Sequence, residues 1–259
     1  MTNIDKLYTL AQDRPLVTNE IHEQNDFYGH ATIIKKYCNL NLDYQLKTVI
    51  THSSSFSGSI WDVHLRFPLP GIIVWSQYDR SFLTNTRKII ETIGPPILYA
   101  DAIIDEERYN IEQKQLGKCL LVFPAHSTHH VIELYDIHSF CNHIEEIGRD
   151  FNTIRVCLYW RDILSGLAEI YEQHGFECVT AGHIYDPLFL PRLRYIINSA
   201  TITMSNSVST HIGCCIALNK PHYIFKMPRT VIGKDYKYLE EASLDTEVIL
   251  KITKEFSTL

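Results

Sequence analysis

The sequence of 259 residues has no apolar run that approaches the roughly 20 residues needed to cross a bilayer as a helix. Its first fifteen residues, MTNIDKLYTLAQDRP, also lack the apolar core of a signal peptide. We therefore expect a cytoplasmic protein without a transmembrane segment. Peripheral association with a membrane stays open.

Clustered positive charge is missing too. The chain has 24 Lys and Arg against 30 Asp and Glu, which gives a formal net charge of -6, and it has no run of basic residues. Nucleic-acid backbones are held by groups of Lys and Arg side chains. We therefore expect no nucleic-acid partner.

Complete metal motifs are absent as well. The seven cysteines are an odd number without a C-x-x-C pair, which is typical of reduced, buried thiols. The spacing of His126, His129 and His130 resembles part of a zinc site, but no H-E-x-x-H helix or cysteine set completes it. We therefore expect no metal ion.

The apolar residues that are present, 45% of the chain, follow a regular pattern in its second half. Strand-length apolar runs occur at 119–123, 154–159, 176–181, 200–204 and 222–225. Helix-like segments separate them, at 138–151, 161–175, 187–199 and 210–220. Strands that alternate with helices predict an α/β fold, with a parallel sheet that carries helices on both faces.

The first half predicts a smaller α/β unit. We expect helices over 4–11, 29–38 and 80–94, and strands over 46–52 and 71–76. Gly94-Pro95-Pro96 stiffens the chain before the regular half, so a domain boundary is expected between residues 95 and 117. The expected domains are residues 1–105 and residues 106–259, the second one ending in a C-terminal helix.

Four hydroxyl side chains stand where the strand 200–204 passes into the helix 210–220: Ser205, Ser207, Ser209 and Thr210. Parallel sheets bind ligands at the carboxyl ends of their strands, and the first turn of a helix attracts phosphate through its backbone N–H groups. Helix capping needs only one of these hydroxyls. Phosphate binding and a serine-rich turn both remain open.

Two further loops follow strands at the same edge of the predicted sheet. His126 and Ser127 come after the strand 119–123, and His183 comes after the strand 176–181. A histidine there can donate a hydrogen bond to phosphate or to a base, or can carry a proton near neutral pH. Each histidine is equally compatible with a packing role.

Together these loops resemble a known family. The loop Pro124-Ala125-His126-Ser127, the turn Ser-x-Ser-x-Ser-Thr (205–210) and the sequence Leu-x-Lys-Pro (218–221) are similar to motifs of GT-B-fold glycosyltransferases of bacterial surface-polysaccharide synthesis. These include sialyltransferases and capsule-assembly transferases, and the resemblance covers about residues 95–230.

The resemblance implies two Rossmann-like domains, of which the N-terminal, acceptor-side one is reduced. It also implies metal-independent transfer of a sugar from a nucleotide-activated donor to a glycan hydroxyl, with no cofactor. His126 and Ser127, with His183 as the alternative contact, would bind the donor nucleotide. The hydroxyls of Ser205, Ser207, Ser209 and Thr210 would bind its phosphate. Apart from the resemblance, Arg192, Arg194 or Lys220 could assist, and each is also compatible with a solvated surface cation.

In such enzymes a loop of the N-terminal domain borders the cleft between the domains. Residues 25–31, NDFYGHA, are similar to such a loop, and Asp26 and His30 are our candidates for the catalytic base, with Glu23 behind them. The turn 52–55, HSSS, is a further cleft candidate. Asp26 can instead serve the start of the helix, with His30 facing solvent.

The short N-terminal half leaves three possibilities open: a reduced domain, a homodimer that completes the cleft, or lost activity. Two other functions also stay open. One is a non-catalytic nucleotide- or glycan-binding partner of a larger transferase. The other is a UDP-sugar 2-epimerase, which needs acidic residues around the sugar.

Overall fold

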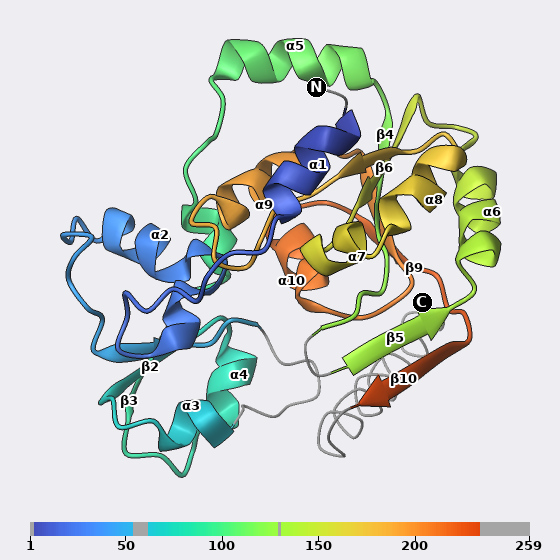
Figure 1. Cartoon of the computed structure of the whole chain (residues 1–259). Helices are drawn as coiled ribbons and strands as arrows, with labels where there is room; N and C mark the ends of the chain where they lie inside the picture. The colour runs from blue at the N-terminus through green and yellow to red at the C-terminus, as the bar shows by residue number, and fades with distance from the viewer. Residues whose placement is uncertain (1–2, 54–61, 129–130, 234–259) are drawn as a thin grey trace.

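The computed structural model describes residues 3–53, 62–128 and 131–233. These residues form an α/β protein with two parallel sheets flanked by helices (Figure 1). The expected C-terminal helix, Ser54 and Ser55, and His129 and His130 lie outside the described residues. No helix in the described part of the chain has both the length and the apolar character of a membrane span.

The larger sheet has five parallel strands in the order β7-β6-β4-β8-β9. They are β4 (Cys119–Phe123), β6 (Thr153–Cys157), β7 (Glu177–Val179), β8 (Ile202–Ser205) and β9 (His222–Ile224). All five predicted strands are confirmed. The chain builds outward from β4 through β6 to β7 and then crosses to β8 and β9 on the other side. The sheet therefore has a topological switch point beside β4, where such sheets bind ligands.

Helices cover both faces of this sheet, and every residue of its central strand, β4, is therefore buried. One face carries α1 (Asn3–Ala11), α6 (Ile137–Gly148), α7 (Trp160–Leu164) and α8 (Leu167–Gln173). The other carries α9 (Phe189–Asn198) and α10 (Thr210–Ala217). Alternate residues of β4 point to opposite faces, so Leu120 joins the first core and Leu121 the second.

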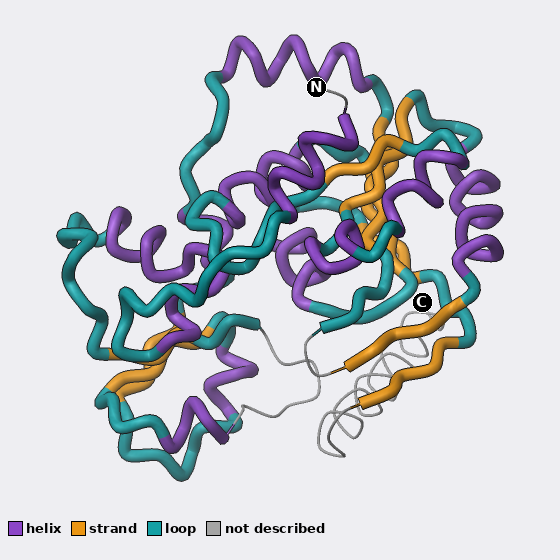
Figure 2. The backbone as a smooth tube through the Cα atoms, viewed as in Figure 1, coloured by secondary structure: helices purple, strands orange, loops and turns teal. Residues whose placement is uncertain are grey.

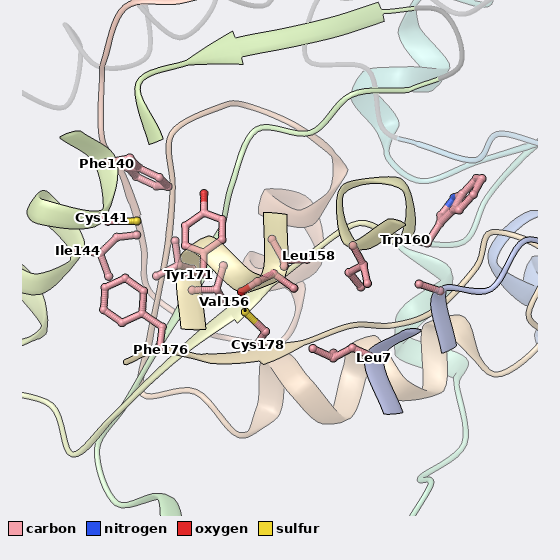
Figure 3. Packing of buried hydrophobic residues seen from close by; sticks show 14 of the residues in the cluster. Leu7, Phe140, Cys141, Ile144, Val156, Leu158, Trp160, Tyr171, Phe176 and Cys178 are labelled. Atoms are coloured by element: carbon pink, nitrogen blue, oxygen red, sulfur yellow. Dashed lines mark hydrogen bonds between the residues drawn. The ribbon is translucent and has the colours of Figure 1, made fainter. Parts of the chain in front are cut away.

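The N-terminal helix α1 packs on the larger sheet, although it lies within the first 105 residues. Its Leu7 and Ala11 are buried in the core formed with α7 and β7. Figure 3 shows Leu7 near Cys178 of β7. The chain thus begins on the five-stranded sheet and then leaves it to build the smaller unit.

The smaller sheet has three parallel strands in the order β1-β2-β3. They are β1 (Thr48–Ile50), β2 (Gly71–Val74) and β3 (Ile89–Thr92). Beside them lie α2 (His30–Tyr37), α3 (Asp62–Arg66), α4 (Gln77–Ser81) and the short 3-10 helices η1 (Glu23–Gly29) and η2 (Pro96–Tyr99).

The helix predicted over 80–94 is wrong. A capping box between Ser76 and Asp79 starts α4, which ends at Ser81, and residues 89–92 form β3. The spacing of the apolar residues 89, 90 and 93 suits a helix equally well. This segment forms a strand because its backbone pairs with β2. That pairing is a tertiary contact, which the local sequence pattern does not reveal.

Helix α5 (Glu106–Leu116) and the strands β5 (Val131–Tyr135) and β10 (Arg229–Gly233) were not predicted either. Helix α5 lies in the connection between the two halves, and β5 pairs antiparallel with β10. Figure 2 shows this two-stranded ribbon apart from the other strands. Arg229 of β10 forms an ion pair with Glu133 of β5 at 2.8 Å. The two strands are far apart in sequence, so no local sequence pattern predicts that they pair.

The two halves meet closely at Tyr28 and Gly29. Both residues have left-handed φ angles, 59° and 78°, and the N–H of Tyr28 donates to the carbonyl of Ile184. A Cβ atom on residue 29 would lie 2.5 Å from the carbonyl oxygen of Pro187. Only glycine permits this backbone conformation and this approach together. The contact sets how the carboxyl ends of the two sheets face each other.

Candidate functional site

A cavity of about 120 Å³ lies between the two sheets at the carboxyl ends of their strands. The five-stranded sheet contributes residues at and after the ends of β4 and β6, together with the start of α10. The three-stranded sheet contributes His52, two residues after β1, and Trp75, directly after β2. Ligands of parallel sheets bind at such ends, so this cavity is the candidate site.

Four histidines line the cavity: His30, His52, His126 and His211. Burial lowers the pKa of His30 and of His52 to about 3 and that of His126 to about 4, and it lowers the pKa of His211 well below its usual value. All four imidazoles are therefore neutral at pH 7. Among the described residues that line the cavity, none is Asp, Glu, Lys or Arg.

Two of these histidines bury a nitrogen that has no hydrogen-bond partner among the described residues: Nδ1 of His30 and Nε2 of His211. Only 1% of His30 and 9% of His211 is exposed. An unpaired buried polar atom costs about 1–3 kcal/mol, and native proteins contain few of them. Both atoms belong to residues that line one cavity, which makes them candidates for hydrogen bonds to a polar ligand there.

The N-terminus of α10 also borders the cavity. Ser209 is its N-cap residue and Thr210 its first helical residue, and both line the cavity. The side chain of Ser209 makes no capping hydrogen bond. The first turn of a helix carries partial positive charge and N–H groups without helical partners, so this end of α10 suits an anion. The space beside Gly213, one turn further on, is open.

The other two residues of the predicted cluster, Ser205 and Ser207, are not at the cavity. The Oγ of Ser205 is 2.7 Å from the carbonyl oxygen of Ser207, to which it donates, and 2.9 Å from Nε2 of His222. Ser205 and Ser207 are both buried and do not line the cavity. They hold the turn after β8, and Ser209 and Thr210 alone of the four are at the cavity.

In the loop after β4, His126 and Ser127 separate in the same way. His126 lines the cavity, with its ring 4.6 Å from that of Tyr159. The Oγ of Ser127 accepts a hydrogen bond of 3.1 Å from the N–H of Glu133 and so anchors β5. Ser127 does not line the cavity.

His183 lies elsewhere as well. It is buried, its ring centroid is 4.3 Å from that of Trp160, and its Nδ1 accepts from the N–H of Tyr185 at 3.2 Å. Its Nε2 is 3.3 Å from a carboxylate oxygen of Asp13. His183 therefore joins the segment after α1 to the loop after β7, and it does not line the cavity.

Of the two candidate catalytic bases, only His30 lines the cavity. Asp26 accepts a hydrogen bond of 3.0 Å from the N–H of Glu20, and burial raises the pKa of its carboxyl group. This carboxylate holds the loop that leads into η1. His30 does not face solvent but is buried at the start of α2.

The cations expected to assist are also occupied elsewhere. Arg192 pairs with Asp186, and Arg194 donates to the carbonyl of Ala100. Lys220 donates to the carbonyls of Asn198 and Ala200, at 2.8 and 2.7 Å. Each of the three cations is thus held by carbonyl or carboxylate oxygens elsewhere. None of them lines the cavity.

Several lining residues escaped the sequence analysis, notably Tyr28, Trp75, Tyr159 and His211. Trp75 directly follows β2, and Tyr159 comes two residues after β6. The rule that ligands bind at the carboxyl ends of parallel strands, applied to every predicted strand, would have singled out both. His211 carried a weaker signal, as a polar residue in the first turn of a predicted helix.

Comparisons with protein-family models, with curated proteins and with solved structures gave no match for this chain. The functional argument therefore depends on the residues around the cavity. No group of three or more His, Cys, Asp or Glu side chains in the described part of the chain is arranged to hold a metal ion.

Proposed function

We propose that this protein is a glycosyltransferase that moves a sugar from a nucleotide-activated donor to a glycan hydroxyl in surface-polysaccharide synthesis. One observation carries the proposal: the carboxyl ends of two parallel sheets open on one cavity, which also contains the uncapped start of α10. We interpret the five-stranded sheet as a Rossmann-like domain that binds the donor, and the three-stranded sheet as a reduced acceptor domain. This arrangement is the one expected of a GT-B-like enzyme.

The start of α10 would bind the donor phosphate. When the bond between the anomeric carbon and the phosphate oxygen breaks, its electron pair leaves with the phosphate, whose negative charge increases. N–H groups and the hydroxyls of Ser209 and Thr210 would stabilise that charge where it develops. The transfer would need no metal ion at the cavity.

His30 would accept the proton of the acceptor hydroxyl as that oxygen attacks the anomeric carbon. Its low pKa makes it a weak base in the free protein. A bound phosphate raises the pKa of a nearby imidazole because it stabilises the charged form. The donor itself would therefore make His30 a better base.

The second candidate function is a non-catalytic protein that binds a nucleotide or glycan. The lack of Asp and Glu among the described lining residues favours it over the 2-epimerase, which needs acidic groups around the sugar ring. Such a protein would bind the donor and give no product. His30→Gln would then change the affinity alone, because there is no reaction to lose.

Calorimetric titration with UDP-, CMP- and GDP-sugars tests the phosphate site. The double variant Ser209→Ala/Thr210→Ala should weaken binding at least about 10-fold, since hydrogen bonds to charged groups contribute about 1.5–3 kcal/mol. Ser139→Ala is the control, because Ser139 is an exposed residue in the first turn of α6. Unchanged affinity in the double variant rejects the site.

Product analysis with glycan acceptors tests the reaction. We expect wild type and Asp26→Asn to form product, because Asp26 does not line the cavity. His30→Gln should bind the donor and lose most turnover. Donor binding without product in the wild type would favour the non-catalytic candidate.

A further inference from the structure

A cluster of polar side chains joins α6 to the end of α8, outside the cavity described above. His138 is the second residue of α6, and Glu145 follows seven residues later, so both lie on one face of the helix. His174 comes directly after the last residue of α8. Figure 1 shows α6 and α8 side by side.

The two imidazoles face each other at a distance that suits a shared metal ion. Nδ1 of His138 is 3.5 Å from Nε2 of His174, and the ring centroids are 5.8 Å apart. Hydrogen bonds from N–H groups are usually about 2.7–3.2 Å long, so this separation is long for a direct bond. A tetrahedral zinc ion about 2.0–2.1 Å from each nitrogen would hold them about 3.4 Å apart.

Glu145 orients one of the two ligands. Its Oε1 lies 2.7 Å from Nδ1 of His174, so it accepts a hydrogen bond from that nitrogen. With the proton held on Nδ1, the lone pair of a neutral His174 lies on Nε2, the atom that faces His138. A carboxylate bonded to the far nitrogen of a ligating histidine is a recurring part of zinc sites.

We propose that His138 and His174 bind a divalent transition-metal ion, best zinc, with Glu145 as the positioning residue. Two imidazoles occupy two corners of the tetrahedron, and water occupies the others. No third His, Cys, Asp or Glu completes the group among the residues described, so binding is reversible. The ion connects α6 to α8 and thereby stabilises the folded state. The site shares no residue with the cavity and does not depend on the proposed transferase activity.

Titration of the metal-free full-length chain with zinc chloride, followed by calorimetry, tests this site. His138→Ala should remove one binding site and reduce the zinc-dependent rise in Tm. Glu145→Gln should weaken that site about 10–100-fold. Glu146→Gln is the matched control, because Glu146 is the neighbouring exposed carboxylate and its only ion pair is with His143 at 3.7 Å within the described residues. It should leave zinc binding unchanged.

Zinc that binds to other histidines and cysteines of the chain contributes equally in wild type and variants. The difference in zinc binding between them therefore reports on this site alone. His138 is exposed, so its substitution should not prevent folding, which far-UV circular dichroism checks. The same number of zinc ions bound by wild type and His138→Ala overturns the proposal. Equal zinc affinity in Glu145→Gln and Glu146→Gln overturns the positioning role of Glu145.

Discussion

The ring of His211 stacks on the ring of Phe123, with centroids 4.8 Å apart and an angle of 11° between the planes. This contact fixes the imidazole in a largely apolar wall of the cavity, where its Nε2 has no hydrogen-bond partner in the described part of the chain. Folding thus buries a polar atom at a net cost, at the point where α10 begins. A loss of stability at a buried polar residue is expected where that residue binds a ligand.

Replacement of this imidazole should separate stability from binding. We expect His211→Phe to raise the free energy of unfolding by about 1 kcal/mol, because it keeps an aromatic ring and removes the unpaired nitrogen. Affinity for the donor should fall. Urea denaturation and donor titration measure the two effects, and His138→Phe, at an exposed position in metal-free buffer, should lack the gain in stability. A less stable variant with undiminished affinity would contradict the assignment.

The stability of the protein should decrease as the pH falls from about 6.5 toward 4. His30, His52 and His64 have folded pKa values of about 3, and His126 and His222 of about 4, against an ordinary value of 6.5. In this window the unfolded chain binds more protons than the folded chain, so acidification favours unfolding.

Three carboxyl groups act in the opposite direction, because burial raises the pKa of Asp26, of Glu133 and, to about 7, of Asp162. Asp162 therefore favours folding as the pH falls from 7 toward 4. We expect the five histidines to outweigh these carboxyl groups. Urea denaturation at pH 7.5, 6.5, 5.5 and 4.5 checks the sign, and His30→Gln should show a shallower pH dependence. A midpoint that is constant or rises on acidification would refute the prediction.

Gly29 lies at the junction between the two halves, and Gly213, which has open space beside it, serves as its control. Gly29→Ala should destabilise the protein by about 2–4 kcal/mol, because alanine is strained at φ 78° and its Cβ would meet Pro187 at 2.5 Å. Gly213→Ala should stabilise it by about 0.5–1 kcal/mol, since the residue is inside α10 with open space beside it. Thermal unfolding compares them. Equal effects would mean that the tight junction does not determine stability.

A buried ion pair connects α2 to the segment before η1. Lys35 pairs with Glu20, and the side chains are only 4% and 0% exposed. Glu20 also accepts from the N–H of Leu46 at 2.9 Å. Lys35→Met should cost about 3–5 kcal/mol because it leaves a buried carboxylate without its cation. The double variant Lys35→Met/Glu20→Gln should recover part of that loss in urea denaturation, and an additive loss would show that the pair is not coupled.

Prediction from sequence succeeded where local pattern and burial agree. Strand β4 is apolar at every position because helices cover both of its faces, and α10 follows a clear strand-to-helix signal. It failed at β3, whose apolar spacing fits a helix as well as an edge strand. It also missed the ribbon of β5 and β10, since only tertiary contact brings those segments together.

For the candidate site, too, the sequence predicted some features and not others. The loops were predicted correctly as neighbours at one edge of the sheet, and five of the nominated residues line the cavity: His30, His52, His126, Ser209 and Thr210. Asp26, Ser127, His183, Ser205 and Ser207 do not. Position in the chain specifies the loop, but the direction of each side chain depends on the partner that it meets after folding.

The alternation of strands and helices that builds the larger sheet, and with it an α/β chain with polar loops at the carboxyl ends of those strands, follows from the sequence alone, because apolar periodicity and turn residues are local properties. Only the tertiary structure decided that the two sheets face each other across one cavity and that its histidines are buried and neutral. Those features arise from close contacts between distant segments, such as Gly29 with Pro187 and His211 with Phe123, and from the desolvation that packing imposes.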